Sequence, residues 1–176
     1  MPKGLRPILA PLDEEVDHAR GPTSGRLILE YGDYECPHSR QASRAIERVE
    51  QEMNIRFAFR HFPLVHIHPH AFGAAAAVEA AAMQDRFWAM HELLFHRQQA
   101  LEDDDLRQYA DQLGLDMARF DHDRLGPDVR RRIRRDVESG LASKHVRSTP
   151  TLFVDGVVYV GRYDAASLTE ALTVVR

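Results

Sequence analysis

The sequence is short of the features that disulfide-bonded, membrane-spanning and nucleic-acid-binding proteins require. It contains a single cysteine, Cys36, so it cannot form an internal disulfide and needs no oxidising compartment. No apolar run approaches the roughly 20 residues of a spanning helix, and the first residues lack the apolar stretch and cleavage site of a secretory signal. The net charge of −4 supplies no basic excess for nucleic acid. We therefore expect a cytoplasmic protein that binds neither membranes nor nucleic acids.

The length and composition are those of one soluble globular domain. With 176 residues, 44% of them hydrophobic and 28% charged, the chain is long enough for one buried core and short for two. Prolines and glycines are dense over residues 1–25, which predicts an irregular lead-in. Residues 26–176 are then expected to form the single domain.

Hydrophobic periodicity within that domain predicts a strand, a helix, a strand, a long helical block, a hairpin and a closing helix. These elements are expected at residues 26–31, 37–53, 55–62, about 66–145, 151–160 and from 164 onward. The hairpin is indicated by Asp155-Gly156, a favoured two-residue turn. The first helix is expected to start at Cys36, because Pro37 suits a first helical turn.

The lone cysteine stands in a motif that is spaced like a dithiol redox centre. The segment reads Tyr34-Glu35-Cys36-Pro37-His38-Ser39, with a hydroxyl where a Cys-x-x-Cys pair has its second thiol. In such a pair the first thiolate attacks a disulfide and the second thiol resolves the mixed disulfide. With Ser39 in the resolving position, only the first half of that chemistry is available within the chain.

The position of Cys36 at a helix start favours a reactive thiolate. Unpaired backbone amides and the positive end of the helix dipole can lower a thiol pKa from ~8.5 to between ~3.5 and ~7.5. His38 can add positive charge or a hydrogen bond, and Ser39, one helical turn on, can donate its hydroxyl to the thiolate. Cys36, His38 and Ser39 are therefore the candidate catalytic residues.

Several motifs share their type and order with one family. They are Cys36-Pro37-His38, Arg60-His61-Phe62-Pro63, Phe87-Trp88 and Ser148-Thr149-Pro150-Thr151. With these motifs and the order of elements, residues from about 20 to 176 resemble the DsbA-like thiol-disulfide oxidoreductases of the thioredoxin superfamily. The resemblance implies an α/β thioredoxin fold with a helical insertion at about 66–145.

The same resemblance implies the geometry of the site. Pro150 is expected to follow a cis peptide bond, and the Thr149-Pro150 loop is expected to face Cys36, so that Pro37, Thr149 and Pro150 contact the substrate. The chain departs from the family pattern at Ser39, where redox members carry the second cysteine. Net oxidase activity is therefore not implied.

Three functions fit these residues. The first is a cytoplasmic monothiol oxidoreductase, in which Cys36 attacks protein or peptide disulfides or glutathionylated thiols. An external thiol then resolves the intermediate. Glutathione is the candidate co-substrate, and no other cofactor is expected. The second is an engineered Cys-to-Ser variant of a dithiol enzyme. The third is a redox-inactive peptide-binding protein that uses the Thr149-Pro150 loop. The fold is also similar to kappa-class glutathione transferases, but those sites place serine first in the motif, where this chain has cysteine.

Two further clusters invite a functional interpretation. Four histidines follow the second predicted strand: His61, His66, His68 and His70. Their spacing is poor for one metal ion and no cysteine or acidic ligand stands among them, so no metal site is expected. Five arginines within 130–135 form the densest charge run, which favours a solvated helix face over docking of an acidic partner.

Overall fold

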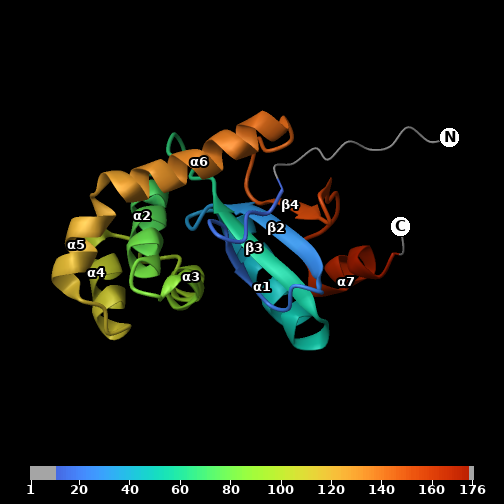
Figure 1. The fold of residues 1–176 in the computed structure, drawn as a ribbon, viewed down its shortest axis with the longest axis horizontal. Coiled ribbons are helices and arrows are strands. Elements are labelled where there is room, and N and C mark those ends of the chain that lie inside the picture. The colour runs from blue at the N-terminus through green and yellow to red at the C-terminus, as the bar shows by residue number, and fades with distance from the viewer. Residues whose placement is uncertain (1–10, 175–176) are drawn as a thin grey trace.

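The computed structural model describes residues 11–174 and shows a twisted five-stranded mixed sheet with helices around it (Figure 1). The strands are β1 (His18–Arg20), β2 (Arg26–Gly32), β3 (Ile55–His61), β4 (Thr151–Val154) and β5 (Val157–Val158). Their order in the sheet is β1-β3-β2-β4-β5. Only β2 and β3 run parallel, and the other three pairings are antiparallel.

The parallel pair is joined by the helix that carries the candidate site. This helix, α1 (Pro37–Glu52), crosses from the end of β2 to the start of β3, as parallel strands require. It buries one apolar face, which includes Ala42, Ile46 and Val49, against the sheet. The closing helix α7 (Ala165–Thr173) packs beside α1. Because α1 is held on both sides, its first turn has a fixed place at the end of β2.

Five helices lie between β3 and β4, in the interval where the sequence predicts a helical block. They are α2 (Ala71–Ala82), α3 (Phe87–His96), α4 (Asp103–Gln112), α5 (Met117–Arg124) and α6 (Pro127–Ser143). The alanine-rich α2 is buried almost all round, because small side chains let α3, α5 and α6 approach it closely. In Figure 1, α2 to α5 gather at one end of the molecule and α6 returns toward β4. The expected α/β fold with a helical insertion is thus confirmed.

The prediction of an irregular lead-in over residues 1–25 is wrong at one segment. His18–Arg20 forms the edge strand β1, in which His18 pairs with Phe59 and Arg20 with Phe57. The open edge of β3 offers backbone hydrogen-bonding groups to this segment, and the high proline and glycine content lies on either side of it. Residues 1–10 and 175–176, where the predicted lead-in begins and the predicted domain ends, lie outside the described part. No helix within residues 11–174 is long and apolar enough to cross a membrane.

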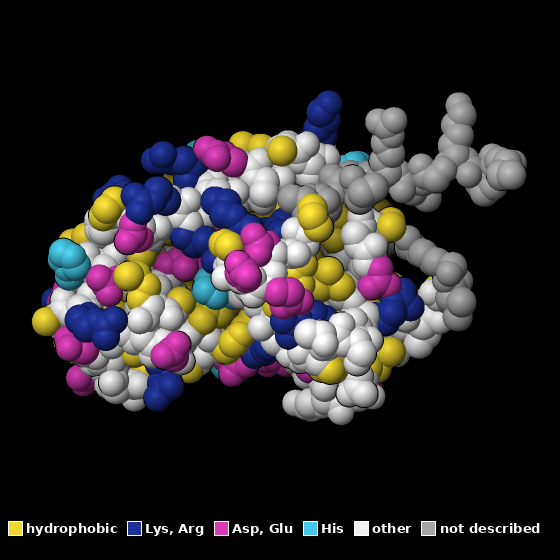
Figure 2. Space-filling model, in the orientation of Figure 1, with side chains coloured by type: hydrophobic (Ala, Val, Ile, Leu, Met, Phe, Trp, Pro, Cys, Tyr) yellow, Lys and Arg dark blue, Asp and Glu magenta, His cyan; other side chains and the backbone are white. Residues whose placement is uncertain are grey.

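The prediction of a solvated arginine face on α6 is also wrong for two of the five residues. Arg132 Nε lies 3.2 Å from Asp136 Oδ1, and Arg135 Nη1 lies 3.1 Å from Asp17 Oδ1. The guanidinium of Arg60 on β3 also binds Asp17, with Nη2 at 2.6 Å from Oδ2. We call Asp17, Arg60, Arg132, Arg135 and Asp136 the α6 charge cluster. Figure 2 shows basic and acidic side chains close together on this face. Asp136 is a local i,i+4 partner of Arg132, but Asp17 lies more than 100 residues before Arg135, so local patterning could not reveal that pairing.

Candidate active site around Cys36

Cys36 is the N-cap of α1, and its thiol points at the loop that the sequence places opposite it. The residue has extended backbone angles, and Pro37 occupies the first position of the helix. The side chain is 5% exposed, and its Sγ donates to the carbonyl oxygen of Thr149 at 3.2 Å. The Thr149-Pro150 peptide bond is cis. Both features that the resemblance implied for this loop are confirmed.

A turn from Asp33 to Cys36 holds the thiol in place and also accounts for Ser39. The Cys36 amide donates to the Asp33 carbonyl at 3.1 Å, and the Glu35 amide donates to Asp33 Oδ1 at 2.8 Å. The fully buried Ser39 accepts the Asp33 amide on its Oγ at 3.2 Å. No hydrogen bond joins Ser39 to Cys36 in the described structure, in contrast to the sequence-based expectation. The hydroxyl instead stabilises the turn, because the buried Asp33 amide needs an acceptor.

The remaining predicted site residues lie around the thiol with different exposure. His38 and Pro37 are exposed on the first turn of α1, and His38 forms no hydrogen bond or ion pair with another described residue. Thr149 is buried, and its Oγ1 lacks a hydrogen-bond partner within the described part. The carbonyl of Pro150 accepts the hydroxyl of Tyr163 at 3.0 Å. The structure therefore brings Cys36, Pro37 and the Thr149-Pro150 loop together and leaves His38 at the rim.

Gln98, in the loop between α3 and α4, is a site residue that sequence reasoning missed. Its Nε2 donates to the carbonyl oxygens of Tyr34 at 2.7 Å and of Cys36 at 2.9 Å. The side chain is buried, so these bonds link the helical insertion to the active-site turn. No sequence signal marks this glutamine, because the turn that it binds lies more than 60 positions earlier.

Glu30, on β2, is a second residue that the sequence analysis did not single out. It is fully buried, and neither carboxyl oxygen has a hydrogen-bond partner among the described residues. Burial raises its pKa from 4.5 to about 8, so the group is largely a neutral acid at pH 7. The pKa of Tyr163 is also raised, first by burial and then by the charges of Glu30 and Cys36. The sequence signal that could have revealed Glu30 is a carboxylate within the apolar run 27–31, six positions before Cys36.

The histidines near β3 are bound by separate carboxylates. His68 Nδ1 lies 2.8 Å from Asp33, and His70 Nδ1 lies 2.9 Å from Glu35, whose hydrogen bond raises the pKa of that imidazole. The buried His61 contacts the carboxylate of Glu79, and His18 contacts the same carboxylate. His66 is exposed. No group of three histidine, cysteine or acidic side chains within residues 11–174 is placed to hold a metal ion. His68 and His70 instead fasten their segment to the turn before Cys36.

Comparison with known proteins places this geometry in a family. The family model described as Thioredoxin matches residues 14–173. A thioredoxin-like oxidoreductase from Silicibacter pomeroyi has a similar structure, with a TM-score of 0.77, 25% identity, and coverage of 88% of this chain and 89% of that one. The thiol-disulfide exchange protein alpha-DsbA2 from Wolbachia pipientis gives a TM-score of 0.76 at 18% identity, covering 88% of this chain and 84% of its own. The second likeness shows the fold alone.

Relatives by sequence carry a different name. The Na(+)/H(+) antiporter NhaA 1 of Mycolicibacterium gilvum is 44% identical over 176 residues, which is 97% of this chain and 28% of the antiporter. The corresponding protein of Salinispora arenicola is 42% identical over 97% of this chain and 26% of its own length. The chain thus spans little more than a quarter of these curated relatives. By its matching family model and by its cis-proline loop facing a cysteine at a helix start, the chain belongs to the thioredoxin family, in the DsbA-like form found among thiol-disulfide oxidoreductases.

Proposed function

We propose that this protein is a cytoplasmic thiol-disulfide oxidoreductase that works with one thiol. The observation that carries the proposal is the position of Cys36 Sγ, at the start of α1 and 3.2 Å from the carbonyl of Thr149 in the cis-proline loop. The chain has no second cysteine to resolve an intermediate. The reaction therefore needs an external thiol, for which glutathione or a protein thiol is suitable.

The proposed reaction is two successive thiol-disulfide exchanges. The Cys36 thiolate attacks one sulfur of a substrate disulfide, so that a Cys36 mixed disulfide forms and the other sulfur leaves with the electron pair and takes a proton from water. An external thiolate then attacks the substrate sulfur or Cys36 itself. When two external thiols react in turn, the substrate disulfide is reduced, one external disulfide is formed, and Cys36 returns as a thiol.

Two surfaces beside Cys36 support a peptide or protein substrate. Backbone groups of the Thr149-Pro150 loop can pair with an extended peptide, as in strand addition. Val65 and Ile67 are 58% and 60% exposed. Their segment is held in place by Asp33, which binds the Leu64 amide and His68. Exposed aliphatic side chains at this place offer apolar contacts to a docked chain.

The contact made by Ser39 supports a natural monothiol site over an engineered one. A hydroxyl oxygen accepts the buried Asp33 amide, whereas a thiol sulfur is a weaker acceptor. Sequencing the native gene tests this point directly. A cysteine codon at position 39 would restore the dithiol enzyme as the function.

Mass spectrometry after exposure to glutathione disulfide tests the mechanism. We expect the wild-type chain to accumulate a persistent glutathione adduct on Cys36, and Cys36→Ser to form none. Ser39→Cys is the informative variant, because its second thiol should displace glutathione and leave an internal disulfide. If iodoacetamide alkylates Cys36 but the wild-type chain forms no adduct, the monothiol mechanism is wrong.

The sequence relatives favour a second candidate function, partnership with a sodium/proton antiporter. The supporting observation is an identity of 44% over 97% of this chain within one such protein. Co-expression with an antiporter transport domain, followed by co-purification and by sodium-dependent proton transport in membrane vesicles, tests it. Cys36→Ala separates the two functions, since a binding role should survive this substitution and a redox role should not.

A further inference from the structure

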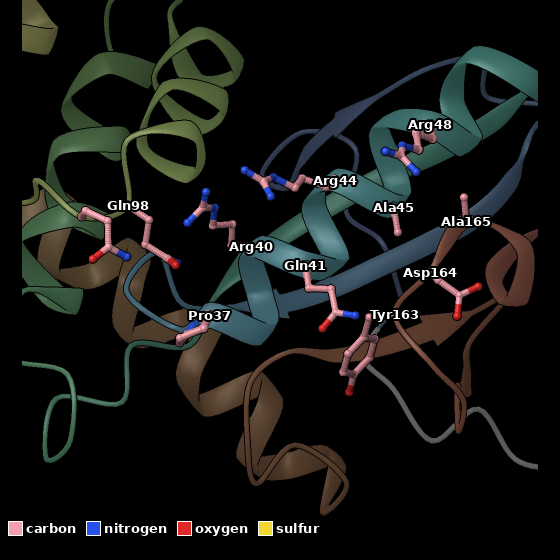
Figure 3. A pocket seen from close by; sticks show the side chains of 11 residues that line it. Pro37, Arg40, Gln41, Arg44, Ala45, Arg48, Gln98, Tyr163, Asp164 and Ala165 are labelled. Atoms are coloured by element: carbon pink, nitrogen blue, oxygen red, sulfur yellow. The ribbon is translucent and has the colours of Figure 1, made fainter.

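Three arginines follow one another along the exposed side of α1. Arg40, Arg44 and Arg48 are spaced four residues apart, so their side chains project from the same face of the helix. We call them the α1 row. Figure 3 shows the row beginning one turn after Pro37, the residue next to Cys36. The row therefore starts one helical turn after Cys36 and leads away from it along α1.

The α1 row forms one wall of an open groove of about 410 Å³. Gln98 borders the groove near Pro37, and Tyr163 and Asp164 border it on the side of α7 (Figure 3). Its volume falls within the range of about 300–1,000 Å³ that is usual for small-molecule and cofactor sites. Gln98 binds the Cys36 turn, and Tyr163 binds the Pro150 carbonyl. The groove thus connects both residues with the positive charge of the α1 row.

The charges of the α1 row are not neutralised within the described part of the chain. None of its guanidinium groups forms an ion pair with a carboxylate of residues 11–174, and Arg40 Nε is buried without a hydrogen-bond partner there. The carboxylate that lines the groove, Asp164, is already engaged by Ser167 and lies 3.3 Å from Arg162. Like charges four residues apart on a helix repel each other, so an anion bound among them would remove an unfavourable interaction.

We propose that the α1 row binds the carboxylates of an anionic peptide thiol or disulfide while the sulfur of that ligand meets Cys36. This inference rests on the proposed function and names its substrate class. A rise of about 1.5 Å per residue separates the ends of the row by about 12 Å, which an extended peptide of three or four residues spans. Planar guanidinium groups bind carboxylates in bidentate geometry. The side-chain amide of Gln41 can pair with the ligand's peptide groups, and Gln98, whose Nε2 is already engaged, can accept a ligand N–H on its Oε1.

In this reaction the Cys36 thiolate attacks one sulfur of the anionic disulfide. A bond forms between Cys36 and the retained half, the original sulfur-sulfur bond breaks, and the other half leaves as a thiolate that takes a proton from water. Cys36 is oxidised and the leaving sulfur is reduced. The α1 row takes no part in the bond changes and acts by raising the local concentration of the anion.

The test compares an anionic disulfide with a cationic one of similar reactivity. We would measure the rate of adduct formation at Cys36 with glutathione disulfide and with cystamine, at low ionic strength, for the wild-type chain and for R40Q/R44Q/R48Q. The expected result is a loss of about tenfold or more with glutathione disulfide and no loss with cystamine. The loss should shrink in 0.5 M salt, because exposed charges are screened.

A matched control removes the same number of charges elsewhere. The variant R130Q/R131Q/R134Q alters exposed arginines of α6 and should leave both rates unchanged. Equal slowing with both disulfides would overturn the proposal, because the row would then act on the thiol itself. No slowing with either would also overturn it. If neither disulfide forms an adduct although iodoacetamide does react, the proposed function fails and this inference falls with it.

Single substitutions distinguish a small ligand from a longer acidic peptide. With glutathione disulfide, whose carboxylates lie close to its sulfur, Arg40→Gln should slow the reaction most and Arg48→Gln least. A peptide disulfide with acidic residues along one arm should depend about equally on all three arginines. An inverted order, with Arg48 most important for glutathione disulfide, would contradict the placement of the sulfur at Cys36.

Discussion

Two groups of arginines in the molecule differ in whether carboxylates neutralise their charge. In the α6 charge cluster, arginines from α6 and β3 surround Asp17 and Asp136, whose side chains are completely buried. Along the α1 row, arginines of the same type face an open groove with no ion-pair partner in the described part. The α1 row and the α6 arginines of the α6 charge cluster both lie on amphipathic helices that begin with proline. The difference arises from what the tertiary fold places opposite each row.

A parallel contrast holds for the two buried glutamates. Glu79 accepts hydrogen bonds from His18 and His61, and these interactions outweigh burial and lower its pKa. Glu30, on β2, has no such partner among residues 11–174, and burial raises its pKa to about 8. The hydrogen bonds to Glu79 therefore favour its carboxylate, whereas the unpaired Glu30 is largely a neutral acid at pH 7. A buried carboxyl group with a strongly shifted pKa is costly to a fold and is typical of functional sites.

The largest effect expected from this contrast is the pH dependence contributed by Glu30. Between pH 4.5 and about 8 the unfolded chain releases the Glu30 proton while the folded chain keeps it, so the free energy of unfolding falls as the pH rises. At about 1.4 kcal/mol for each pH unit, the loss over this interval reaches at most about 5 kcal/mol. Urea denaturation at pH 5, 7 and 9 should show it, and Glu30→Gln should flatten the curve. Exposed Glu138→Gln is the control, and parallel curves for all three proteins would contradict the assignment.

Breaking the α6 charge cluster should have the next largest effect. Asp17→Ala leaves Arg60 buried without its main carboxylate partner, so we expect a loss of about 3–5 kcal/mol in the free energy of unfolding at pH 7. The pKa of Asp17 is lowered to about 2, because hydrogen bonds and the charge of Arg60 outweigh the opposing effect of burial. Its contribution is thus present above pH 3.8 and is lost as the pH falls toward 2.

Asp128→Ala is the matched control for this prediction. Asp128 forms an ion pair with Arg131 on the surface of α6, where both side chains are well exposed. Its removal should cost less than about 1 kcal/mol. Thermal or urea denaturation of the two alanine variants compares a buried pair with an exposed pair on the same side of the molecule. Equal losses would mean that the α6 charge cluster contributes no more than a surface ion pair.

Neutralising the α1 row should have the smallest effect on stability, and of the opposite sign. R40Q/R44Q/R48Q removes two repulsive contacts between neighbours four residues apart, which should raise the free energy of unfolding by about 0.4–1 kcal/mol at low salt. Glutamine and arginine have similar helix propensities, so α1 itself is preserved. Denaturation with and without 0.5 M salt measures the gain. A clear loss of stability would show that the row is structural, which is opposed to its proposed ligand role.

Much of the site follows from local sequence. The strand before Cys36, the proline at the first helical position and the order of elements are all properties of short segments, and the structure contains each of them. The Thr149-Pro150 loop was identified by resemblance, since a threonine and a proline do not by themselves indicate a position opposite a cysteine. The edge strand β1 escaped prediction because its pairing partner, β3, lies over 30 residues later.

The sequence alone is enough to place one thiol at the start of a helix and to show that the chain carries no second cysteine to resolve its intermediates. The partners of Arg60 and of the Cys36 thiol depend instead on the tertiary fold, because these partners are distant along the chain. Arg60 meets Asp17 across 43 positions, and Cys36 meets Gln98 across 62 and Thr149 across 113. Both the α1 row and the α6 arginines lie on amphipathic helices. Folding adds the distant Asp17 to the α6 arginines and leaves the α1 row facing the groove next to Pro37.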